Sequence, residues 1–275
     1  MPFFQNRSGN RLWFEDSGSG VAVVFVHGWC MSSSIWLYQV RDLGSSFRVI
    51  APDLRGHGCS RDLYGSLDFE GFASDLSDLL CFLDLKRIVL VGWSMGAQVV
   101  LQAYHEISDR LAALVLVSAT PCFTAKTDFP HGLPRNEASG MRIKVGRDAD
   151  RALDGFHARM FAEGEIESRQ EADHIRTMLA SIAPPETVSA LAALESLATA
   201  DMRDLLPGIT TPTLVVNGER DKICLPQASA YLADNIRSAG RKVFPECGHA
   251  PFLTRHIEFN ADIARFAGSV CDRDV

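Results

Sequence analysis

One serine lies in a glycine-flanked pattern that is typical of a catalytic nucleophile. The pattern is Gly92-x-Ser94-x-Gly96, with the apolar run 88–91 before it and a helical pattern over 97–106 after it. In a nucleophile elbow, the serine occupies a strained strand-to-helix turn, and the glycines allow strand and helix to approach closely. The pattern alone is weak evidence, but a strand before it and a helix after it are the context that it requires. Ser94 is therefore the candidate nucleophile.

A serine hydroxyl is a poor nucleophile at neutral pH and needs a base to take its proton. On an elbow-type fold, the partners follow the serine in the order acid and then histidine, each on a loop after a strand. Of the eight histidines, His249 lies in a glycine-flanked loop after the strand-like run 242–244. His57 lies in a Gly-rich turn and His256 begins a helical pattern. We therefore predict that His249 is the base.

A third residue must hold the base in the correct tautomer. Asp221 follows the strand-like run 213–217 and so has the required place in the chain order. Aspartates after strands are often turn or cap residues, however. Glu219 in the same turn, and Asp128 after the preceding strand, remain alternative acids. The predicted triad is Ser94, Asp221 and His249.

Acyl transfer also requires two backbone N–H groups directed at the oxyanion that develops in the transition state. One comes from the residue after the nucleophile and the other from the loop after an early strand. These residues are Met95 and Trp29. We expect His27 and Gly28 to shape the second loop, and residues 53–58 to form a structural turn.

The elements that must position these residues alternate between strands and helices. The first two strand-like runs are joined by a turn composition that suggests a hairpin, and the later apolar runs are typical of strands buried on both faces. The alternation predicts an α/β protein with a mostly parallel central sheet and helices on both faces. The expected strands are 2–4, 11–15, 21–26, 47–52, 88–91, 111–117, 213–217 and 242–244, and the expected helices are 35–43, 69–83, 97–106, one from about 227, and 256–266.

The alternation stops at Pro121 and resumes near residue 207. Between these points only helical patterns appear, around 149–160, 175–182 and 188–198. Such an insertion is expected to cover the carboxyl edge of the sheet, where ligands of open α/β sheets bind. The predicted division is a core of residues 1–120 and 207–275 with an inserted helical cap of residues 121–206.

The composition excludes several classes of function. The chain of 275 residues is 47% apolar and 22% charged, as in ordinary globular proteins, and its net charge of −7 favours neither nucleic acid nor an anionic membrane as a partner. No apolar run reaches the roughly 18 residues of a membrane span, and the N-terminal residues lack a secretion-signal pattern. We expect a cytoplasmic monomer.

No cofactor or metal site is predicted. The seven cysteines are scattered and show no CxxC spacing, which argues against a disulfide framework or a zinc site. The chain has no G-x-G-x-x-G after its first strand, no P-loop and no clustered metal ligands.

With these motifs together, the chain resembles the α/β-hydrolase superfamily over essentially its whole length. The motifs are specific to the superfamily and not to one substrate; they are His27-Gly28-Trp29, Asp53-x-Arg55-Gly56-His57-Gly58-x-Ser60, Gly92-Trp93-Ser94-Met95-Gly96, Asp221 and Gly248-His249-Ala250-Pro251-Phe252. Within the superfamily, the chain most resembles the pimeloyl-[acyl-carrier-protein] methyl ester carboxylesterases of biotin synthesis, through Gly92-Trp93-Ser94, 118–123 and 249–252.

This resemblance implies a serine carboxylesterase that removes a methyl ester from a pimeloyl chain carried on acyl carrier protein. The family's cap presents arginines to the acidic carrier and an aromatic residue to the acyl chain. Arg151 and Arg169 align with two of the basic positions and Phe156 with the aromatic one. Two further basic positions fall on Gly155 and Asp173, which is a departure from the family.

The charge pattern and the aromatic residues bear on the same question. Residues 135–147 hold four basic residues against one acid, which fits either a docking patch for an acidic protein or a solvated helix face. The candidate walls for an aliphatic chain are Trp29, Trp93, Phe123 and Phe156. Another small ester, a lactone, a C–C bond or a perhydrolase reaction is the alternative chemistry. A receptor without activity is disfavoured, because binding alone does not need a triad.

Overall fold

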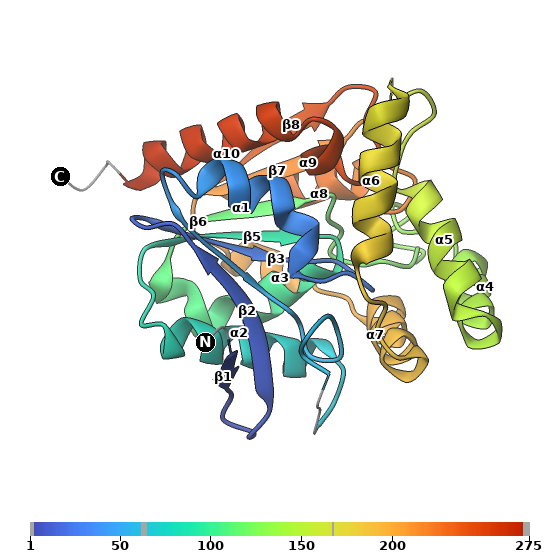
Figure 1. Ribbon diagram of the computed structural model, residues 1–275, viewed down its shortest axis with the longest axis horizontal. Helices are drawn as coiled ribbons and strands as arrows, with labels where there is room; N and C mark the ends of the chain where they lie inside the picture. Colours follow the sequence, from blue (N-terminus) through green and yellow to red (C-terminus); the bar gives the residue numbers. More distant parts are fainter. Residues whose placement is uncertain (1–2, 62–64, 167, 272–275) are drawn as a thin grey trace.

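The computed structural model describes residues 3–61, 65–166 and 168–271. Pro2, at the start of the first expected strand, lies outside them. Eight strands form one sheet in the order β1-β2-β4-β3-β5-β6-β7-β8 (Figure 1). The strands are β1 (Phe3–Gln5), β2 (Arg11–Ser17), β3 (Ala22–Val26), β4 (Arg48–Pro52), β5 (Ile88–Trp93), β6 (Leu111–Val117), β7 (Thr213–Gly218) and β8 (Ala239–Phe244).

The sheet is parallel except at its first edge. β1 pairs with β2, and β2 with β4, in antiparallel register, and every later pair is parallel. The predicted α/β fold with a mostly parallel sheet is thus confirmed. All residues of β3 and β5 are buried, as expected of β-branched runs covered on both faces.

Helices cover both faces of the sheet. Figure 1 shows α1 and α10 on one face and α2 and α3 on the other, and α8 packs against β7 and β8. The α-helices of the sheet region are α1 (Leu37–Leu43), α2 (Phe69–Phe82), α3 (Met95–Ile107), α8 (Pro226–Asn235), α9 (Pro251–Thr254) and α10 (His256–Cys271). Short 3-10 turns are η1 (Ser33–Trp36), η2 (Ser108–Arg110) and η3 (Arg203–Gly208).

A side-chain cap fixes the start of α2. The side chain of Asp68 accepts a hydrogen bond from the Gly71 N–H at 2.8 Å, which caps α2 at its N-terminus. The apolar residues of α2 recur at helical spacing and bury one face against the core. Within the described residues, no helix is both long enough and apolar enough to span a membrane.

Four further helices lie between β6 and β7 in the chain and gather at one side of the sheet (Figure 1). They are α4 (Arg135–Arg147), α5 (Ala149–Arg159), α6 (Arg169–Ser181) and α7 (Thr187–Thr199); we call them the inserted helices. Three match the helical patterns in the sequence. The fourth, α4, was not predicted, because it buries only Ala138 and Val145 and therefore has no apolar stripe.

Candidate active site

Ser94 stands on the turn between β5 and α3 in a conformation that side chains rarely adopt. Its φ of 56° and ψ of −119° cost on the order of 1–3 kcal/mol and persist because the surroundings enforce them. A Cβ on Gly92 would collide with the backbone of α3, and one on Gly96 with the carbonyl oxygen of Val26. The two glycines therefore allow the tight turn that presents the Ser94 side chain above the sheet.

Asp221 and His249 meet beyond the ends of β7 and β8. The Nδ1 atom of His249 lies 2.8 Å from Oδ2 of Asp221, and both side chains are buried. Oδ1 of Asp221 accepts backbone N–H groups from Ile223 at 2.8 Å and Cys224 at 3.1 Å. A carboxylate held in this way fixes the proton of the imidazole on Nδ1 and leaves Nε2 as the basic atom.

Nε2 of His249 is buried and has no hydrogen-bond partner among the described residues. The backbone of His249 is held as well, since the carbonyl oxygen of this residue accepts a hydrogen bond from the indole N–H of Trp93 at 2.9 Å. The unused Nε2 is therefore the atom able to accept a proton from a nucleophile.

The two alternative acids lie elsewhere. Glu219 is exposed and accepts the backbone N–H of Glu246 at 3.2 Å. The Asp128 side chain is 69% exposed and pairs with Arg203 at 2.9 Å. The pairing with Arg203 holds the pKa of the Asp128 carboxyl below its usual value. Neither carboxylate contacts His249 in the described structure.

The two expected oxyanion donors, Trp29 and Met95, follow neighbouring strands, β3 and β5. Val26 of β3 pairs with Gly92 of β5, so the loops that follow these strands emerge side by side. The backbone N–H groups of Trp29 and Met95 have no acceptor within the described residues. Their neighbourhood with Ser94 fits the arrangement that acyl transfer requires.

Buried histidines support the loop that carries Trp29. His27 donates from Nδ1 to the carbonyl oxygen of Gly28 at 2.8 Å, and its Nε2 accepts the N–H of Leu54 at 3.0 Å. Burial lowers the pKa of His27 to about 4 and that of His57 to about 3. Both imidazoles are therefore neutral at pH 7 and, with their bonds to backbone, act as supports.

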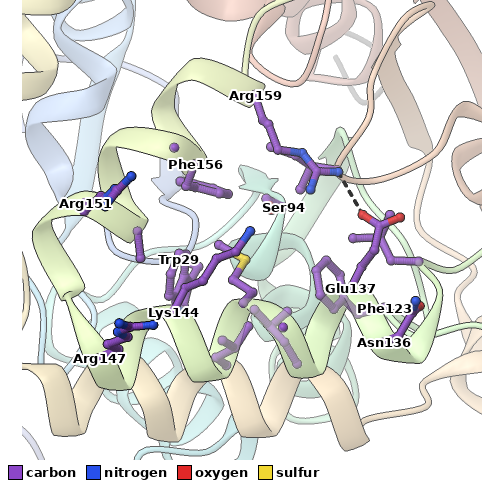
Figure 2. Close-up of a pocket in the computed structure, with 18 of the residues that line it drawn as sticks. Trp29, Ser94, Phe123, Asn136, Glu137, Lys144, Arg147, Arg151, Phe156 and Arg159 are labelled. Atoms are coloured by element: carbon purple, nitrogen blue, oxygen red, sulfur yellow. Dashed lines mark hydrogen bonds and ion pairs between the residues drawn. The ribbon is translucent and has the colours of Figure 1, made fainter.

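A cavity of about 940 Å³ opens above Ser94 (Figure 2). The sheet core contributes Trp29, Ser94 and Ile223, and the insertion between β6 and β7 contributes most of the wall. Of the residues expected to bind substrate, Trp29, Phe123, Phe156 and Arg151 line this cavity. Sequence reasoning missed the apolar residues Leu133, Met141, Leu194, Leu197 and Ile223.

Two residues expected to bind substrate lie away from the cavity. Trp93 is fully buried beneath the site. Its ring centroid lies 4.9 Å from that of Phe252, and its indole N–H donates a hydrogen bond to the carbonyl oxygen of His249. Arg169 is the exposed first residue of α6 and does not line the cavity. Residue type alone gave no sign of these placements, because the packing of neighbouring elements determines them.

Among the charged residues that line the cavity, four basic ones outnumber the two acids, Glu137 and Asp148. Lys144 and Arg147 of α4 and Arg151 of α5 line it, and none of their side chains has an ion-pair partner in the described part of the chain. Arg159, also on the wall, pairs with Glu137 at 3.2 Å (Figure 2). The basic run 135–147 hinted at this wall, but the missing apolar stripe left the orientation of α4 undetermined.

Comparisons with known proteins agree with this architecture. Residues 21–256 match the family described as the alpha/beta hydrolase fold. Over 244 residues the chain is 32% identical to the "Pimeloyl-[acyl-carrier protein] methyl ester esterase" of Nitrosomonas europaea, covering 88% of this chain and 94% of that protein.

Solved structures are similar over nearly the whole chain. An esterase from Exiguobacterium antarcticum has a TM-score of 0.89 and 27% identity, covering 96% of this chain and 98% of that one. A bromoperoxidase from Bacillus anthracis has a TM-score of 0.86 and 27% identity, covering 94% and 96% respectively. The chain therefore belongs to the α/β-hydrolase family, as its motifs predict, and is a hydrolase.

Proposed function

We propose that this protein is a serine carboxylesterase that hydrolyses the methyl ester of pimeloyl-acyl carrier protein, in biotin biosynthesis. The observation that carries the proposal is the cavity, which has Ser94 at its floor, apolar side chains on its inner wall and unpaired cations on its outer wall. This polarity suits an aliphatic ester delivered by an acidic carrier. The name and similarity of the Nitrosomonas relative support the same substrate.

The first half of the reaction forms an acyl-enzyme. Ser94 Oγ attacks the ester carbonyl carbon while Nε2 of His249 takes the hydroxyl proton. The carbonyl oxygen becomes an oxyanion that accepts hydrogen bonds from the N–H groups of Trp29 and Met95. When the intermediate collapses, the bond to the methoxy group breaks and His249 donates the proton to the methoxy oxygen, so that methanol leaves.

The second half returns the free serine. A water molecule gives a proton to Nε2 of His249 and attacks the acyl carbon; the bond to Ser94 Oγ then breaks as His249 donates that proton to Oγ. The pimeloyl carboxylate then leaves. Asp221 stabilises the imidazolium that forms in both halves, through its 2.8 Å contact with Nδ1.

We further propose that residues 121–206 work as a cap on a core of residues 1–120 and 207–275. Phe123 and Phe156 would contact the acyl chain, and Trp29 would contact it from the core side. Arg151, with Lys144 and Arg147 beside it, would attract the acidic carrier protein to the cavity mouth, since complementary charge raises association rates. Arg169 lies on another part of the cap and is not needed for this role.

A second candidate function is hydrolysis or perhydrolysis of a free small ester. The similarity to the Exiguobacterium esterase and the Bacillus bromoperoxidase favours it, because each covers nearly the whole chain at 27% identity. The same nucleophile and base would serve this chemistry. Dependence on the carrier protein separates the two functions.

Mass spectrometry of the carrier-bound pimeloyl methyl ester tests the proposal. The wild type, Ser94→Ala and the same ester without carrier are compared under identical conditions. We expect loss of one methyl group with the wild type only, and faster on the carrier. No demethylation of the carrier-bound ester, with p-nitrophenyl butyrate still cleaved, would favour the second candidate.

A further inference from the structure

The last residue of α5 and the segment that follows it contact both loops that carry the proposed acid and base. Arg159 donates from Nη2 to the carbonyl oxygen of Lys222, next to Asp221, at 2.9 Å. The carbonyl oxygen of Met160 accepts the backbone N–H of His249 at 2.7 Å. With Glu165, these residues form what we call the cap tether: Arg159, Met160 and Glu165.

Glu165 makes the largest set of contacts in the tether. Its side chain is buried, with the residue only 1% exposed. Oε2 accepts the backbone N–H groups of Ala162 at 2.6 Å and Gly248 at 2.7 Å, and Oε1 accepts the Thr254 hydroxyl at 2.6 Å. A buried carboxylate is costly unless donors surround it, and here three donors do so.

These contacts lie on both sides of the proposed base. Gly248 precedes His249, and Thr254 ends the short helix α9 that follows it. A Cβ on Gly248 would press against the backbone of Met160 and Phe161, so the loop and the tether are in direct contact. Glu165 therefore fixes the loop from the side of the inserted helices, while Trp93 and Asp221 hold His249 from the core.

The same segment continues directly from a wall of the cavity. Phe156 and Arg151 of α5 line the cavity, and the tether begins at the last residue of that helix. A displacement of α5 would therefore be transmitted to the loop of His249. None of the tether contacts involves the substrate-facing atoms of the triad.

We infer that Glu165 is a positioning residue, which couples the docking of α5 to the placement of His249. This inference rests on the proposed role of His249 as the base. Displacement of a catalytic group by about 1 Å costs as much as about 100-fold in rate, even when the cause lies away from the chemistry. Loss of the Glu165 contacts should therefore lower kcat and leave KM for a small ester nearly unchanged.

The test compares three variants on p-nitrophenyl butyrate. Glu165→Ala removes all three contacts, and we expect kcat to fall by about 10- to 100-fold. Glu165→Gln restores activity, because its amide oxygen accepts both N–H groups and its NH₂ donates to the Thr254 hydroxyl. Glu163→Ala is the matched control, since Glu163 is an exposed carboxylate in the same segment, and it should keep the wild-type kcat.

The outcomes separate this inference from the proposed function. Ser94→Ala is measured alongside, and if it retains wild-type activity the proposed triad fails. If Ser94 is required but Glu165→Ala keeps its kcat, or changes KM only, the positioning role is overturned. A Glu165→Gln variant as slow as Glu165→Ala would also overturn it. If Glu165→Ala does not fold, Glu165→Asp replaces it, because the shorter side chain cannot reach Gly248 and Thr254 together. A wild-type kcat in Glu165→Asp would also contradict the positioning role.

Discussion

The loops at the sheet edge, which follow β7 and β8 and carry Asp221 and His249, differ from the inserted helices in whether their polar side chains are paired within the chain. Asp221 and His249 are buried and contact each other at 2.8 Å, and the backbone binds the remaining carboxylate oxygen. Lys144, Arg147 and Arg151 are exposed and lack ion-pair partners among the described residues. Folding therefore fixes the geometry of the loops, whereas the cations of the helices remain available to a molecule outside the chain.

The largest effect that this comparison predicts is at Ser94. Ser94→Ala removes the proposed nucleophile, and we expect kcat for p-nitrophenyl butyrate to fall by about 10⁶-fold, as for a triad serine elsewhere. Ser77→Ala, at a buried serine on α2, is the matched control and should retain activity. A fall of less than about tenfold in Ser94→Ala would place the nucleophile elsewhere, and the loops of Asp221 and His249 would then not form the catalytic region.

The next effect separates the candidate acids. Asp221→Asn keeps the shape of the side chain but favours the wrong imidazole tautomer, so we expect kcat to fall by about 10⁴-fold. Glu219→Gln changes an exposed carboxylate after the same strand and should leave kcat unchanged. Steady-state kinetics at pH 8 measure both variants. The reverse order of effects would identify Glu219 as the acid.

Acid should destabilise the loops at the sheet edge. Burial lowers the pKa of His27 to about 4 from its ordinary value of 6.5. Between these pH values the unfolded chain binds a proton that the folded chain does not, so stability present above pH 6.5 is lost as pH falls toward 4. For His27 the loss at pH 4 is on the order of 3 kcal/mol. His57, with a pKa of about 3, extends it to lower pH.

Thermal unfolding followed by circular dichroism from pH 7 to pH 4 measures this effect. Other groups also titrate in that range, so the decisive quantity is the difference between variants. His27→Gln should flatten the decrease in Tm with falling pH. His174→Gln, at an exposed histidine on α6, should not. Equal slopes in the wild type and in His27→Gln would contradict the assignment of His27 as a buried neutral support.

The sheet was predictable from sequence because burial leaves a local signature. The continuous apolar runs of β3, β5 and β6 mark strands covered on both faces, and the helices between them follow from periodicity. Helix α4 has no such signature. Its position depends on contacts with the adjacent helix α5 and with α7, which lies further along the chain, and such contacts leave no periodic pattern in the sequence.

The candidate site divides in the same way. Ser94, Asp221 and His249 were selected by their order in the chain and by their places after β5, β7 and β8, and the structure brings Asp221 and His249 into contact. The cavity wall was not deducible, because it depends on tertiary contacts such as the 2.9 Å bond from the Trp29 indole to the Ala190 carbonyl oxygen. Glu165 was not identified for the same reason: two of its three partners, Gly248 and Thr254, are 83 and 89 residues away in sequence.

The smallest effect concerns the inserted helices. Arg151→Gln should lower kcat/KM for a carrier-bound ester by up to about fivefold, because an exposed charge pair contributes about 0.2–1 kcal/mol. The free ester should react at the wild-type rate, since the proposed triad is unchanged. Raising the salt concentration should weaken the carrier preference of the wild type and reduce the difference between wild type and variant.

Arg169→Gln is the matched control, because Arg169 is an exposed arginine on the inserted helices that does not line the cavity. If cavity position decides carrier recognition, Arg169→Gln keeps the wild-type kcat/KM on both esters. Equal losses in the two variants would mean that the carrier contacts a wider surface, reaching from α5 to α6. An equal loss on carrier-bound and free ester in Arg151→Gln would instead place the arginine against the acyl chain. Arg151 would then act on the bound substrate, as the residues of the loops do, and the contrast between the two regions would no longer hold.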